Sequence, residues 1–117
     1  MNNTRLTNAE ALSLWHGVYV ELVRSSGLDI SSRQLALMLT VYLSPPPHTV
    51  RGLASELEIA KPVITRALDS LGQRGLLKRV RDESDRRSVL VERTTEGTAF
   101  LSTLSDLIVA ASGGKNS

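Results

Sequence analysis

The sequence predicts a mainly α-helical domain that carries one small β-hairpin. Three observations lead to this fold class. Several segments repeat apolar residues at helical spacing behind Ser or Thr caps, and two short β-branched segments flank a charged loop. Hydrophobic residues make up 41% of the chain but aromatic residues only 3%, so the core must be aliphatic. The length of 117 residues suits a single domain over 1–117 with a small core.

The first predicted helix covers about residues 8–25. Thr7 and Glu10 are three residues apart, which is the capping-box spacing that begins a helix. Gly27 is a candidate for its carboxyl-terminal cap. The apolar residues cover more than one face, so we expect this helix to be buried on more than one side.

The second predicted helix follows Ser31, which has Gln34 at the same capping-box spacing. Apolar residues then recur on one face. Three prolines, Pro45 to Pro47, forbid its continuation. The helix should therefore end near Leu43.

The next segment predicts a helix, a tight turn and another helix. Thr49 can cap a short helix over Val50–Leu57, and the turn covers Glu58–Ala60. The following helix begins near Lys61 and ends at Gly75. Pro62 is tolerated in its first turn. One apolar face recurs at spacings of three, four and seven, through Ile64, Ala67, Leu68 and Leu71.

Two strands are predicted next, over residues 76–81 and 88–94, with a charged loop at Asp82–Arg87 between them. Thr94 can cap a last helix that ends near Ala111. A helix-turn-helix followed directly by a two-stranded hairpin is a winged helix. We expect residues 31–94 to form this lobe, flanked by terminal helices over 7–26 and 95–112.

Charge is unevenly distributed along the chain. The net charge is only +2, yet nine basic and five acidic residues lie between Lys61 and Arg93. A basic segment in a nearly neutral chain indicates a polyanion-facing side, although a solvated charged hairpin would look similar. The chain has no cysteine, no long apolar run and no signal-peptide layout, so we expect a cytoplasmic protein without membrane contact.

The second helix of a helix-turn-helix enters the DNA major groove and reads base edges with its amino-terminal residues. Here that helix covers 61–74. Its outward positions are those that do not belong to the apolar face. Arg66 can form bidentate hydrogen bonds with guanine, while Thr65 or Val63 can pack against a thymine methyl group. The predicted contacts with double-stranded DNA are Lys61, Pro62, Val63, Thr65 and Arg66, with Thr49 as a further candidate.

The charged loop over 82–87 suits a wing that inserts one arginine into the minor groove, which is narrow and negative over A·T tracts. Holding a long side chain costs rotamer entropy, and a neighbouring carboxylate can orient it in advance. We therefore expect Asp85 to orient Arg87. Arg86, Arg79 and Arg81 are candidate phosphate contacts. A solvated cluster of weak ion pairs is the alternative.

Residues 48–97 resemble the MarR family of bacterial transcription regulators. The resemblance rests on Asp85-x-Arg87, then Thr94-x-x-Gly97, and on the join "LGQRGLLKR" between helix and wing. It implies a homodimer that binds a pseudo-palindromic operator and represses by blocking polymerase. Arg93 departs from the family, where Leu is usual. Many members bind small-molecule effectors, but this sequence identifies none.

In the family the dimer forms from the terminal helices, and those helices carry surplus apolar residues here. The candidates for this interface are Leu12, Trp15, Tyr19, Leu101, Leu104 and Ile108. The same surplus would also suit a second function, a winged-helix protein-interaction module that docks another protein through its terminal helices.

An enzyme is the third alternative, and the sequence disfavours it. His16 and His48 are the two histidines, and they lie on different predicted elements. No Ser-His-Asp arrangement, phosphate-binding loop or clustered set of metal ligands is present in the sequence. We therefore predict no catalytic residue, no metal and no cofactor.

Overall fold

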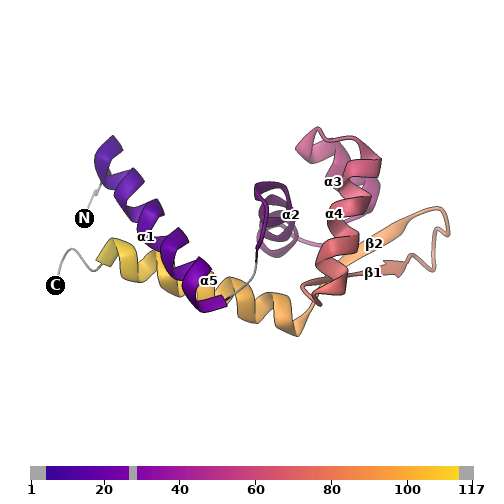
Figure 1. Cartoon of the computed structure of the whole chain (residues 1–117). Helices are drawn as coiled ribbons and strands as arrows, with labels where there is room; N and C mark the ends of the chain where they lie inside the picture. Colours follow the sequence, from indigo (N-terminus) through magenta and orange to yellow (C-terminus); the bar gives the residue numbers. More distant parts are fainter. Residues whose placement is uncertain (1–4, 27–28, 114–117) are drawn as a thin grey trace. The chain divides into compact units, whose positions relative to one another are not determined.

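The computed structural model describes residues 5–26 and 29–113 (Figure 1). It confirms a mainly α-helical fold with one antiparallel hairpin. The chain divides into two compact units, one of Met1–Asp29 with Leu101–Ser117 and the other of Ile30–Phe100. The elements are α1 (Asn8–Ser26), α2 (Ser32–Leu43), α3 (Val50–Leu57), α4 (Lys61–Gln73), β1 (Leu77–Arg81), β2 (Val89–Arg93) and α5 (Thr95–Gly113).

Two predicted capping boxes are formed. At the start of α1, Thr7 N donates to Glu10 Oε1 at 2.9 Å and Glu10 N donates to Thr7 Oγ1 at 3.1 Å. At α2, Ser31 and Gln34 exchange the same two bonds, each at 3.1 Å. Each pair satisfies amide groups that the first helical turn leaves unpaired. Gly27, the predicted cap of α1, lies outside the described residues.

The helix-turn-helix consists of α3 and α4. Thr49 Oγ1 accepts a hydrogen bond from Gly52 N at 2.9 Å and so caps α3, as predicted. Glu58 turns the chain in the left-handed conformation, with φ of 55°. Gly75, directly after the cap of α4, also has a positive φ of 73°, where a side chain would be strained.

The core of the Ile30–Phe100 unit is aliphatic. The predicted apolar face of α4 is buried, and Ile64, Leu68 and Leu71 are at most 1% exposed. Their partners come from α2, α3 and the hairpin, and this packing fixes the outward face of α4. The other buried apolar members are Leu37, Met38, Val41, Val50, Leu53, Ala67, Leu76, Leu77, Val91 and one aromatic residue, Phe100.

The hairpin pairs β1 with β2 in a register that runs from Leu77 opposite Arg93 to Arg81 opposite Val89. A third segment extends it, because Val91 N donates to His48 O at 2.8 Å and Thr49 forms a bridge with Leu90. The residues that precede α3 therefore lie along the outer edge of β2. This pairing joins the wing to the helix-turn-helix.

The other unit contains α1 and the larger part of α5. Val18, Leu22 and Leu104 are buried. Helix α5 continues to Gly113, two residues beyond the predicted end at Ala111. Its first turn groups with the Ile30–Phe100 unit, whereas the sequence predicts a lobe that ends at residue 94. Within 5–26 and 29–113, no helix is long and apolar enough to span a membrane.

Candidate nucleic-acid interface

The outward face of α4 carries the predicted base-contacting residues. Lys61, Pro62 and Arg66 are exposed, while Val63 and Thr65 are half-buried. All five lie in the first two turns of the helix. Lys61 and Thr65 line a hollow beside the wing, whereas Val63 and Arg66 line another hollow beside the start of α2. Their contacts with bases stay predictions.

Helix α4 begins without a side-chain cap. Ala60 occupies the N-cap position and forms no side-chain hydrogen bond there, while Pro62 lies in the first turn. Pro62 has no amide hydrogen, and Val63 N and Ile64 N both donate to Ala60 O, at 3.0 and 3.1 Å. The amide and the side chain of Lys61 are therefore the donors that this end of α4 can offer to an anion.

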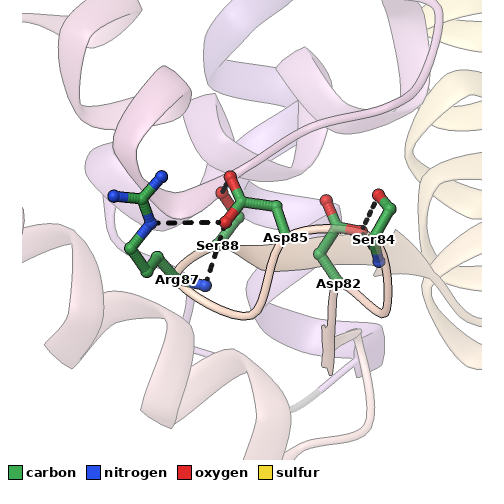
Figure 2. Close-up of polar contacts among 5 residues, drawn as sticks. All are labelled: Asp82, Ser84, Asp85, Arg87 and Ser88. Carbon is green, nitrogen blue, oxygen red and sulfur yellow. Dashed lines mark hydrogen bonds and ion pairs between the residues drawn. The ribbon is translucent and has the colours of Figure 1, made fainter.

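The first half of the wing loop is organised by Asp82. Its Oδ1 accepts hydrogen bonds from Ser84 Oγ at 2.8 Å and from Ser84 N at 3.0 Å (Figure 2). The side-chain bond from Ser84, reinforced by its backbone bond, lowers the pKa of the Asp82 carboxyl below its ordinary value of 3.8. We did not predict this role for Asp82, although an Asx turn is common where Asp lies two residues before Ser.

The second half of the loop is organised by Asp85. Asp85 Oδ1 accepts a hydrogen bond from Arg87 N at 3.1 Å and lies 3.5 Å from Arg87 Nε. Both interactions are drawn as dashed lines in Figure 2. The other oxygen of Asp85 accepts from Ser88 Oγ at 3.3 Å. The Arg87 side chain is 90% exposed, so the pair adds little stability in water. Its effect is geometric, since it limits the directions in which Arg87 can extend.

Arg79 is paired within the protein, and its predicted phosphate contact stays a prediction. Its Nη2 donates to Asp69 Oδ1, so the guanidinium joins β1 to α4. The sequence predicts a phosphate contact for Arg79, and the structure gives it a partner ten residues back along the chain. Arg81 and Arg86, the other candidate phosphate contacts, are exposed.

A hollow of about 180 Å³ lies between the helix-turn-helix and the wing. It brings Thr49, predicted as a DNA contact, beside α4 and the wing, although its hydroxyl is engaged in capping α3. Arg51 is also part of this hollow and is exposed, and our reading of the sequence missed it. Its position in the first turn of α3, two residues after the cap, was the available signal. The lining residues are Thr49, Val50, Arg51, Lys61, Thr65, Arg79, Arg87, Ser88 and Val89.

The predicted interface residues of the terminal helices differ in exposure. Leu12, Trp15 and Tyr19 are 72%, 44% and 38% exposed, and the two aromatic rings lie 5.0 Å apart between centroids. Leu101 and Ile108 are half-buried, but Leu104 is only 4% exposed and belongs to the core of the single chain. We missed Val23, which is 70% exposed and continues the stripe of α1.

The two histidines lie in different surroundings. His48 Nε2 lies 3.2 Å from Ser44 O, while His16 is exposed on α1. No group of three or more His, Cys, Asp or Glu side chains in the described part of the chain could hold a metal ion.

Comparison with known proteins identifies the family. The MarR family model matches residues 30–89, just over half of the chain. The HTH-type transcriptional regulator PecS of Dickeya dadantii (strain 3937) is 32% identical over 78 residues, which are 65% of this chain and 47% of PecS. The chain thus spans about half the length of this curated relative.

Solved structures share the fold. The S. aureus MepR–DNA complex has a TM-score of 0.77 at 18% identity, covering 91% of this chain and 84% of that chain. A mutant of E. coli MarR complexed with operator DNA has a TM-score of 0.67 at 24% identity, covering 91% and 71%. The matched residues 30–89 include α2, the helix-turn-helix, β1 and the wing loop, and end at the first residue of β2. The protein therefore belongs to the MarR family of winged helix-turn-helix transcriptional regulators.

Proposed function

We propose that this protein is a sequence-specific regulator that binds double-stranded DNA as a homodimer and acts as a repressor. Helix α4 would lie in the major groove and the wing in the minor groove. The observation that carries the proposal is the Asp85–Arg87 pair, which orients an exposed arginine on the same lobe as the outward face of α4. MepR and MarR, which share the fold, were each solved with DNA, and this supports the proposal.

Major-groove reading is favoured by how α4 is held. Its apolar face is buried, so the helix cannot rotate to turn Lys61 and Arg66 inward. Arg66 can then make a bidentate contact with guanine, and Lys61 beside the start of the helix can contact phosphate. Arg51 across the hollow supplies a further cation for the backbone.

Minor-groove insertion is favoured by the loop. Two aspartates bind backbone amides of their own loop, and one of them also holds Arg87. Such bonds reduce the conformations that Arg87 must give up on binding, and so reduce the entropic cost of insertion. The ion pair is weak enough in water for the guanidinium to leave Asp85 for the groove.

Dimerisation is favoured by the exposed face of α1. Leu12, Trp15, Tyr19 and Val23 are spaced three or four apart, so they form one apolar stripe on this helix. Exposed apolar stripes of this kind mark association sites. We propose that 7–26 and 95–112 form the dimerisation helices and that 31–94 is the DNA-binding lobe. Two-fold symmetry would then pair with a pseudo-palindromic operator.

The same stripe favours a second candidate function, in which the terminal helices dock a different protein. The two functions differ in self-association. Light scattering at several concentrations should give the mass of a dimer for the first function. A persistent monomer with an intact fold would favour the second.

The direct test of DNA binding uses sheared genomic DNA from the source of the protein, incubated with purified protein near physiological salt. We expect sharp enrichment of fragments that share a two-fold symmetric site, because operator symmetry follows protein symmetry. Uniform recovery that falls steeply with salt would indicate only phosphate binding and would contradict the proposal. Transcription from a recovered promoter, measured with and without the protein, tests repression.

A further inference from the structure

Side chains from outside the hairpin hold the base of the wing. The Tyr42 hydroxyl accepts a hydrogen bond from Thr94 N at 3.0 Å and lies 3.2 Å from both Leu76 O and Thr94 O. Leu76 directly precedes β1 and Thr94 directly follows β2. One hydroxyl of α2 therefore bonds to both strands at the end of the hairpin opposite the loop. Its single hydrogen can serve one of the two carbonyl groups at a time.

Arg93, the last residue of β2, extends this contact to the end of α2. Its Nε donates to Val41 O at 3.1 Å and its Nη2 to Ser44 O at 3.2 Å. The guanidinium carbon also lies 5.6 Å from the centroid of the Tyr42 ring. A cation at a helix carboxyl terminus is favourable because the last carbonyl groups carry partial negative charge, and the ring face adds attraction.

The first turn of α5 closes the same cluster. Thr94 Oγ1 donates to Gly75 O at 2.6 Å and accepts from Gly97 N at 2.9 Å. A Cβ atom at position 97 would overlap Tyr42 Oη and Leu76 O. Tyr42, Arg93, Thr94 and Gly97, which we call the wing-base cluster, thus bind together the ends of α2 and β2 and the starts of β1 and α5.

We propose that Tyr42 and Arg93 are positioning residues for DNA binding, which set the direction of the wing and thereby the place of Arg87. The inference rests on the proposed function of the wing. The five residues of β1, and the four residues of β2 that precede Arg93, lie between the cluster and the loop. At about 3.4 Å per residue the wing is a lever of about 17 Å, so a tilt of about 10° at the base moves the tip by about 3 Å. That displacement exceeds the tolerance of a hydrogen bond.

Other contacts also hold the hairpin. Leu77 and Val91 anchor it in the core by hydrophobic contact, which is non-directional, while the hydrogen bond from Val91 N to His48 O and the Arg79–Asp69 pair each hold one strand. The wing-base cluster adds directional contacts at the end of the hairpin opposite the loop. The hydrogen bonds of Tyr42 and the two hydrogen bonds of the Arg93 guanidinium have preferred angles. They therefore restrict the tilt of the hairpin relative to α2 as well as its distance from α2. The cluster lies far along the hairpin from Arg87, and its effect on DNA must therefore pass through the wing.

The decisive experiment is a double-mutant cycle between Tyr42→Phe and Arg87→Ala, with affinity measured on an operator recovered by genomic capture. Tyr42→Phe removes only the hydroxyl, and we expect about tenfold weaker binding, the equivalent of about 1.4 kcal/mol. In the Arg87→Ala background, Tyr42→Phe should have no further effect. The matched control is Thr40→Val, which removes an α2 hydroxyl that bonds only Ala36 O of its own helix. It should bind normally.

A second double-mutant cycle combines variants of Arg93 with Arg87→Ala and includes the conservative change Arg93→Lys. Arg93→Leu removes both contacts with α2, whereas Arg93→Lys retains a cation near the same carbonyl groups. We expect the Lys variant to bind DNA more tightly than the Leu variant, and both losses to disappear when Arg87 is Ala. Equal losses with and without Arg87 would indicate a general structural role and would overturn the proposal.

A measurement without DNA separates this inference from the proposed function. Because the chain has no cysteine, Glu83→Cys in the wing loop and Ser55→Cys on α3, both at exposed positions, can carry paired spin labels. We expect Tyr42→Phe to broaden or shift the distance distribution between them. An unchanged distribution overturns the inference even if Arg87 proves essential. If the distribution shifts but Arg87→Ala leaves DNA affinity intact, the proposed function of the wing fails, and the assignment of Tyr42 and Arg93 to DNA binding is overturned with it.

Discussion

Asp85 Oδ1 lies 3.5 Å from Arg87 Nε and accepts a hydrogen bond from Arg87 N at 3.1 Å. One carboxylate oxygen therefore shapes the loop backbone and orients the side chain that the loop presents. This accounts for the presence of both signs of charge in the loop at 82–87. Asp82 and Asp85 bind loop amides, while Arg86 and Arg87 are exposed on the loop.

Arg87→Ala should weaken operator binding by about 1–3 kcal/mol without unfolding the protein, because the side chain is 90% exposed. Fluorescence anisotropy with labelled operator measures the affinity, and circular dichroism checks the fold. Arg5→Ala removes the same charge from the other unit and serves as the control. Equal losses for the two variants would mean that only net charge matters.

Asp85→Asn should weaken operator binding less than Arg87→Ala does. An asparagine oxygen can still accept the Arg87 amide, but it has no charge to hold the guanidinium, so more rotamer entropy is lost on binding. The slope of log affinity against log salt should stay near that of the unmodified protein, because the same cations reach phosphate. Tighter binding of Asp85→Asn would show that the carboxylate acts only by repelling DNA.

Alanine substitutions of Lys61 and Arg66 should weaken DNA binding in different ways. Arg66→Ala should relax the preference at one operator position by about 1–3 kcal/mol, since it removes a base contact. Lys61→Ala should weaken binding to all sequences alike and reduce the salt slope by about 1, since it removes a phosphate contact. Selection from a randomised operator library, repeated at two salt concentrations, measures both. The assignment is reversed if Lys61→Ala changes the selected sequence.

Asp82 should titrate below its ordinary pKa of 3.8, because Ser84 hydrogen bonds favour its charged form. The depressed folded pKa means that Asp82 contributes loop order above pH 3.8 and loses this contribution as pH falls through the lower folded value. Carboxyl NMR titration measures it. Ser84→Ala should move the midpoint back toward 3.8, whereas Ser88→Ala, whose hydroxyl bonds Asp85, should not. An Asp82 titration midpoint that does not change in Ser84→Ala would contradict this account.

Two Leu→Ala variants should separate association from folding. Leu12 is 72% exposed, so Leu12→Ala should weaken the dimer in sedimentation with little effect on the folded monomer. Leu104 is 4% exposed, so Leu104→Ala should lower the free energy of unfolding by about 2–5 kcal/mol. Unfolding must be compared at equal protein concentration, because dimerisation contributes to stability. An undiminished dimer for Leu12→Ala would contradict its place in the interface.

The features that the sequence alone determined depend on partners a few residues apart. The caps at Thr7, Ser31 and Thr49 bond to amides three residues later, and Asp85 bonds to Arg87 two residues later. The turn at Gly75 is equally local, since only its own backbone angles require a glycine. Spacing is sufficient for such contacts, because the helix or turn itself brings the groups together.

Tertiary structure alone decided the contacts between distant residues. Arg79 pairs with Asp69, and Arg93 donates a hydrogen bond to Val41, which lies 52 residues earlier in the sequence. Leu104 is buried, whereas the apolar pattern of its helix did not show which of its faces would be covered. The spacing of apolar residues identifies the buried face of a helix but not the element that covers it. A basic residue likewise has many possible acidic or carbonyl partners elsewhere in the sequence. Packing selects among them, because the buried side chains of α2, α4 and the hairpin must fill the core closely.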